Sequence, residues 1–138
     1  MNRRNISSGV VWEDIVGYSR AVRIGNLIEI SGTTSIIDDK LVGKDDAYLQ
    51  TITILNKVKS ALEEADASLK DVIRTRMFVT DISKWEEYGK AHQEFFSEIK
   101  PATSMIEVKS LIDPNMLIEI EVTAVVGDWI TEYDLLDL

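Results

Sequence analysis

The fold is decided by the stretch Leu117-Ile118-Glu119-Ile120-Glu121-Val122-Thr123-Ala124-Val125-Val126. Successive side chains of a β-strand point to opposite faces of a sheet. The even-numbered positions form an entirely apolar row, whereas the odd-numbered positions include two glutamates and a threonine. The pattern therefore predicts a strand with one face against a helix-covered core and a second face of mixed character.

Further strands are predicted on both sides of this stretch. Residues 18–24 and 27–32 form two extended runs around Gly25-Asn26, which is typical of a β-hairpin. Residues 72–80 and 103–109 are rich in β-type residues, and the polar, glycine-bearing residues 33–44 are predicted to form a loop. Alternation predicts that Thr103 shares the outer face of the sheet with Glu119, while Ile73 and Ile106 point inward.

Two helices are predicted between these strands. In the first, Asp45 or Asp46 is the candidate N-cap and the helix ends near Asp66, a residue type that tolerates left-handed backbone geometry. Ser83 begins a candidate capping box for the second, which Lys100-Pro101 ends. The apolar stripe of the first helix recurs at three- and four-residue spacing and consists of Tyr48, Ile52, Leu55, Val58, Leu62 and Ala65, with Gln50 and Lys57 assigned to the polar side.

The element order β-β-α-β-α-β-β, without repeats or linkers, predicts one α+β domain over residues 1–138. Its core spans residues 17–126, with two helices on one face of a mixed sheet. Residues 127–138 form an acidic extension, interpreted as a short docked helix or a frayed tail.

Composition excludes several classes of function. The chain has 138 residues, no Cys, one His and a net charge of −9. Disulfides, thiolate chemistry and a multi-histidine metal site are thereby excluded within one chain. The negative charge argues against a nucleic-acid partner, and no apolar run is long enough to span a membrane. Without an apolar leader segment, the protein is predicted to be cytoplasmic.

The predicted outer face mixes large apolar side chains with charges. A solvated face would carry fewer apolar groups, so we predict a homo-oligomer in which these faces pack together and their charges pair. The alternative is a solvated face with scattered apolar residues. The residues assigned to this face are Leu27, Phe78, Met105, Leu117, Val125, Arg74, Arg76, Glu29, Glu107, Glu119 and Glu121.

Several short motifs, in this order and spacing, resemble the RidA/YjgF family of reactive-intermediate deaminases, formerly called endoribonuclease L-PSP. The motifs are Gly17-Tyr18-Ser19-Arg20-Ala21-Val22, Gly25-Asn26, Ser31-Gly32, Gln50-Thr51, Ala67-Ser68-Leu69, Asp71-Val72, Phe78-Val79-Thr80-Asp81, Phe95-Phe96, Pro101-Ala102 and Ile118-Glu119-Ile120-Glu121. The resemblance implies a chorismate-mutase-like fold and a homotrimeric barrel with ligand clefts between subunits.

The resemblance also implies an activity and a set of site residues. Family members typically hydrolyse enamines and imines, such as 2-aminoacrylate and 2-iminobutyrate, to 2-keto acids and ammonia, without a metal or organic cofactor. On this basis Glu119 positions the water, while Tyr18, Ser31 and Gly32 bind the substrate. A carboxylate can orient or deprotonate water attacking a C=N carbon.

Two positions depart from the family pattern. Thr103 stands where deaminating members carry a carboxylate-binding Arg, and Gly89 stands where they carry an Asn. A threonine cannot form the bidentate, charge-assisted contact of a guanidinium. Arg76, on the predicted outer face, could supply the missing charge, or it could merely neutralise the glutamates there.

Three functions are consistent with these features. The first is a RidA-like deaminase or related hydrolase whose specificity is altered by Thr103. The second is a non-catalytic homotrimer that binds a small metabolite in the same cleft. The third, the ribonuclease role historically attached to the family, is disfavoured by the net charge of −9. His92, on the apolar side of the second helix, is interpreted as a packing residue.

Overall fold

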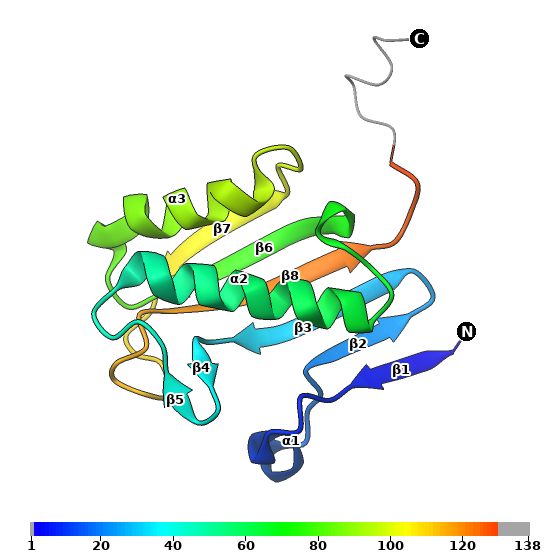
Figure 1. Cartoon of the computed structure of the whole chain (residues 1–138), viewed down its shortest axis with the longest axis horizontal. Helices are drawn as coiled ribbons and strands as arrows, with labels where there is room; N and C mark the ends of the chain where they lie inside the picture. The colour runs from blue at the N-terminus through cyan, green and yellow to red at the C-terminus, as the bar shows by residue number, and fades with distance from the viewer. Residues whose placement is uncertain (1, 130–138) are drawn as a thin grey trace, which may run out of the picture.

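The computed structural model describes residues 2–129. A six-stranded sheet has the order β1-β2-β3-β8-β6-β7, and helices α2 and α3 lie across one of its faces (Figure 1). Among the described strands of this sheet, only the β6–β7 pair is parallel. The structure thus confirms the predicted α+β fold with a mixed sheet. The strands of this sheet are β1 (Arg3–Ile6), β2 (Ala21–Ile24), β3 (Leu27–Thr33), β6 (Val72–Val79), β7 (Ala102–Glu107) and β8 (Ile118–Val125).

The remaining elements connect these strands. The helices are α1 (Val11–Val16), α2 (Ala47–Glu64) and α3 (Trp85–Phe96), with 3-10 turns η1 (Leu69–Asp71) and η2 (Ile82–Lys84). A small hairpin of β4 (Ile36–Ile37) and β5 (Lys40–Leu41) lies in the segment predicted as a loop. Sequence reasoning also missed β1 and α1. No helix in the described range 2–129 is both long enough and apolar enough to cross a bilayer.

The core lies between the sheet and the two long helices. Ile118, Ile120 and Val122 of β8 are fully buried, as their alternation predicted. The Asp46 side chain caps α2 by accepting a hydrogen bond from Leu49 N (2.9 Å). Asp66, just beyond the end of α2, adopts a φ of 59°. These ends of the first predicted helix are confirmed.

The buried stripe of α2 differs from the prediction at Gln50. Its side chain is fully buried, and its amide nitrogen donates to Gly43 O and Asn115 O, both at 3.0 Å. Its amide oxygen accepts from Leu117 N (2.9 Å). The assignment of Gln50 to the polar side was wrong, because backbone groups of two loops satisfy its hydrogen bonds inside the protein.

The face assignments of β6 and β7 need correction. β6 shifts register against β8 between Val72 and Arg74, so Val72 is buried and Ile73 is 46% exposed. In the parallel β6–β7 pair, Thr103 lies opposite Thr75, which faces the helices. Thr103 therefore lies on the helix side of the sheet, away from Glu119, and Ile106 is exposed instead. Both rows of β7 mix polar and apolar residues, so alternation alone could not orient this edge strand.

The predicted capping box of the second helix needs correction, whereas the acidic extension is largely outside the described residues. The capping residue is Asp81 rather than Ser83. The Asp81 carboxylate accepts a hydrogen bond from Ser83 N, and it caps the 3-10 turn η2, which directly precedes α3. The acidic extension lies outside the described residues from position 130 onward. Within its described part, Trp129 Nε1 donates to Asp71 Oδ1 (3.1 Å).

Candidate functional site

A cleft of about 290 Å³ lies beside the point where β3 continues into the β4–β5 hairpin. Its lining comes from α1, the residues flanking β2, the end of β3, α2 and the start of β8. Three predicted site residues, Tyr18, Gly32 and Glu119, line this cleft together. The other lining residues are Val10, Val11, Trp12, Val16, Arg20, Thr34, Ile36, Asp39, Lys57, Ile112 and Met116.

Gly32 provides the space in which the Glu119 carboxylate lies. The pairing of β3 with β8 shifts between Ile30 and Thr33, and Gly32 lies within that irregular stretch. A Cβ atom built on Gly32 would lie 2.8 Å from both Cδ and Oε2 of Glu119. Any larger residue at position 32 would therefore displace the carboxylate.

The environment of Glu119 makes its carboxylate more basic than usual. Burial raises the pKa of Glu119 and the nearby charge of Glu121 adds to the increase, while Arg20 opposes it. A carboxylate with a raised pKa accepts a proton more readily from a bound water molecule. Within residues 2–129, no three His, Asp or Glu side chains come together as metal ligands would.

Two cationic side chains of the cleft were not predicted as site residues. Arg20 Nη2 donates to Gly32 O (2.7 Å), and Lys57 Nζ donates to Thr34 O and Ile36 O (both 2.7 Å). Burial, with a contribution from Arg20, lowers the pKa of Lys57 to about 8. The helical spacing of Lys57 from Ile54 and Ala61 was the sequence signal, since it places Lys57 beside the buried stripe.

Ser31 contributes through the backbone around it. Its hydroxyl donates to Ser19 O (2.6 Å), and its amide donates to Arg20 O (3.0 Å). These bonds fix the segment that carries Tyr18 and Arg20 against β3. Ser31 lines a neighbouring hollow with Tyr18 rather than the Glu119 cleft.

Thr103 and Arg76 lie outside this cleft in the single chain. The Oγ1 atoms of Thr103 and Thr75 are 2.8 Å apart, and Thr75 Oγ1 is 2.8 Å from Nε2 of His92. Thr103 thus belongs to a polar cluster under α3. Arg76 does share the outer face with Glu119, but it lies opposite Glu121 in the strand pairing.

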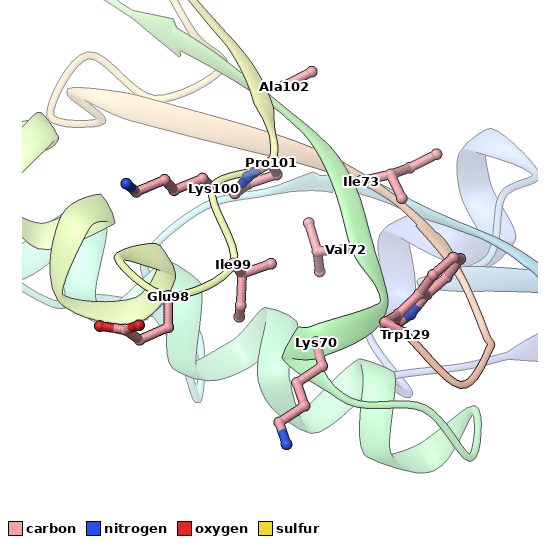
Figure 2. Close-up of a pocket in the computed structure, with 9 residues that line it drawn as sticks. All are labelled: Lys70, Val72, Ile73, Glu98, Ile99, Lys100, Pro101, Ala102 and Trp129. Atoms are coloured by element: carbon pink, nitrogen blue, oxygen red, sulfur yellow. The ribbon is translucent and has the colours of Figure 1, made fainter. Parts of the chain in front are cut away.

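A second hollow, of about 470 Å³, lies near the ends of η1 and α3 and contains none of the predicted site residues. Figure 2 shows Val72, Ile73, Ile99 and Trp129 around it, with the charged end of Glu98 pointing away from these apolar side chains. Because its lining lacks converging polar groups, it offers less to chemistry than the Glu119 cleft does.

Gly32→Ala is expected to slow any reaction that depends on the Glu119 carboxylate by roughly 10- to 100-fold, because misplacing a reacting group by about 1 Å can cost that much in rate. The fold should survive, since the atoms that must move belong to the end of a flexible side chain. Steady-state kinetics and thermal unfolding would measure the two effects.

A double-mutant cycle is the control for this prediction. If Gly32→Ala acts by displacing Glu119, adding it to Glu119→Gln should cause little further loss. Additive losses would contradict that explanation.

The fold and cleft define a class of protein: a single-sheet α+β protein with a cleft of small-molecule size, containing a half-buried carboxylate. Comparison with known proteins identifies the family. The profile described as endoribonuclease L-PSP matches residues 12–126. The chain belongs to this family, which is the RidA/YjgF family.

Relatives and solved structures agree with this assignment. The chain is 34% identical to an uncharacterized protein of Streptomyces coelicolor, covering 90% of this chain and 92% of that protein. It is 32% identical to the 3-aminoacrylate deaminase RutC of Acinetobacter baylyi, covering 75% of this chain and 82% of that enzyme. The crystal structure of Rv2704 from Mycobacterium tuberculosis, a YjgF/YER057c/UK114 family member, matches with a TM-score of 0.83 and 48% identity, covering 91% of this chain and 100% of Rv2704.

Proposed function

We propose that this protein is a RidA-like deaminase that hydrolyses a small enamine or imine. The observation that carries the proposal is the Glu119 carboxylate, half-buried over Gly32 in a cleft of small-molecule size. The similarity to a 3-aminoacrylate deaminase supports the same class of reaction. The proposed active form is a homotrimer with this cleft at the contact between copies.

The proposed reaction needs one water molecule and one proton acceptor. Glu119 takes one proton from the water as the water oxygen bonds to the C=N carbon, and the nitrogen gains a proton from solvent, which gives a carbinolamine. Glu119 then gives its proton to the nitrogen, the C–N bond breaks, the hydroxyl proton returns to solvent, and ammonia and a 2-keto acid are released. An enamine substrate first moves a proton from nitrogen to carbon to become the imine. Tyr18 and Gly32 are proposed to hold the substrate, and Ser31 to keep their segment in place.

The test is keto acid release from 2-aminoacrylate and 2-iminobutyrate generated in the assay by an auxiliary enzyme. Release faster than spontaneous hydrolysis is the expected result for the wild-type protein. Thr103→Arg is measured beside it, because the family resemblance implies a carboxylate-binding Arg at this position. If neither protein exceeds the spontaneous rate on either substrate, the proposal fails for imino acids.

One observation favours a non-catalytic alternative. Thr103 is uncharged, so it supplies no cation for a substrate carboxylate. Its hydroxyl is already hydrogen-bonded to Thr75 and to Pro101 O (3.2 Å). A trimer that binds a small metabolite without turning it over would show saturable ligand binding and no acceleration of imine hydrolysis.

A further inference from the structure

Neither cation of the Glu119 cleft forms an ion pair within salt-bridge distance in the described part of the chain, although the carboxylates of Glu119 and Asp39 line the same cleft. Across residues 2–129, the side-chain ion pair within salt-bridge distance joins Arg4 to Asp66, and neither Arg20 nor Lys57 takes part in one. The Nε atom of Arg20 is buried and has no acceptor among the described residues. A partly buried cation without a directly paired carboxylate is costly, so this arrangement favours binding of an anion.

The two cationic groups are held in place before any ligand arrives. Arg20 is fixed by Gly32 O, whose residue lies directly under the Glu119 carboxyl. Lys57 Nζ is fixed by two carbonyl oxygens at 2.7 Å, and an ammonium has a third N–H to donate. Pre-positioned donors lose less conformational entropy on binding than mobile surface side chains do.

We infer that Arg20, with Lys57 as a second positive charge, binds the carboxylate of the substrate in the Glu119 cleft. The inference rests on the function proposed above and assigns to Arg20 the charge that Thr103 cannot provide. A guanidinium is well suited to a carboxylate because its parallel N–H groups match the two oxygens.

The rest of the lining restricts the substrate further. Trp12, Ile112 and Met116 are among the apolar side chains that line the remainder of the cleft, which also includes Thr34 and Asp39. Its volume of about 290 Å³ is at the lower end of the range for ligand pockets. The substrate class is therefore a small carboxylate-bearing imine or enamine with a short apolar group.

The experiment measures binding rather than turnover, so that it is independent of the proposed reaction. Wild-type protein is titrated by NMR with 2-ketobutyrate, which cannot be deaminated, and with its neutral amide. The carboxylate should bind at least tenfold more tightly than the amide. Arg20→Gln should weaken carboxylate binding about 10- to 100-fold and leave amide binding within about threefold, because a charge-assisted hydrogen bond contributes roughly that much. Lys57→Met should have a smaller effect in the same direction.

Lys59→Met, an exposed lysine on the same helix, is the matched control and should bind like wild type. The inference is overturned by the wild-type protein alone if it binds 2-ketobutyrate and the amide equally tightly, or if it does not bind 2-ketobutyrate. Three results with the variants would also overturn it. Arg20→Gln could bind 2-ketobutyrate as tightly as wild type, or it could lose the same affinity for the acid and the amide. The third result is a loss of acid affinity in Arg76→Gln but not in Arg20→Gln. If wild type binds the acid selectively through Arg20 but no imine is turned over, the inference stands and the deaminase proposal fails.

Discussion

Glu119→Gln is expected to lower kcat/KM for imine hydrolysis by about 10²- to 10⁴-fold, the range typical of removing a general base. Glutamine has nearly the same shape, so substrate binding should be largely retained and the loss should fall on kcat. Steady-state kinetics on 2-iminobutyrate would measure it. Glu121→Gln, the next carboxylate on the same face of β8, is the matched control and should retain most of the activity. Wild-type turnover in Glu119→Gln would refute the assigned role.

The same variant has a predicted effect on stability. Because burial raises the pKa of Glu119, the folded protein holds this proton more tightly than the unfolded chain does. The contribution to the free energy of unfolding is therefore present at low pH and is lost as pH rises through the raised pKa. Glutamine does not ionise, so at pH 7 Glu119→Gln should unfold at the same temperature as wild type or higher. Thermal unfolding near pH 4 and pH 7 would show whether the variant gains relative stability as pH rises.

Gln50→Leu is expected to destabilise the protein by about 3 kcal/mol, or roughly 10 °C in Tm. The variant removes the hydrogen-bond partner of Leu117 N and those of the carbonyl groups of Gly43 and Asn115. Each unsatisfied buried polar group costs about 1–3 kcal/mol. The expected total lies at the lower end of the sum for three groups, because water can reach part of the two loops. Chemical or thermal unfolding would measure the change.

Asn56→Leu is the matched control, since Asn56 is an exposed amide on the same helix. Its effect should stay within about 0.5 kcal/mol. Gln50→Leu should also raise KM, because Met116 of the cleft directly precedes Leu117 and would lose its support. A Gln50→Leu protein as stable as wild type would show that the three hydrogen bonds contribute little.

Much of the fold could be predicted from local pattern. The alternation at residues 117–126, the Gly25-Asn26 turn and the cap at Asp46 each depend on neighbouring residues in the chain, and each is confirmed. Local pattern also brought Tyr18, Gly32 and Glu119 into consideration through a family resemblance, and these three residues do line one cleft. Their roles in binding and catalysis remain predictions.

The remaining features depend on contacts between distant segments. The face of Thr103 follows from the parallel register with β6, and the burial of Gln50 follows from two loops that approach it in space. Arg20 and Lys57 are 37 positions apart in the chain, yet carbonyl groups of β3 and the β4 region hold both in one cleft. The sequence by itself determined the two long helices and the strands β2, β3, β6, β7 and β8, because these choices depend on local periodicity. Tertiary structure alone decided which charges share the cleft, because strand register and long-range hydrogen bonds leave no periodic signal in the chain.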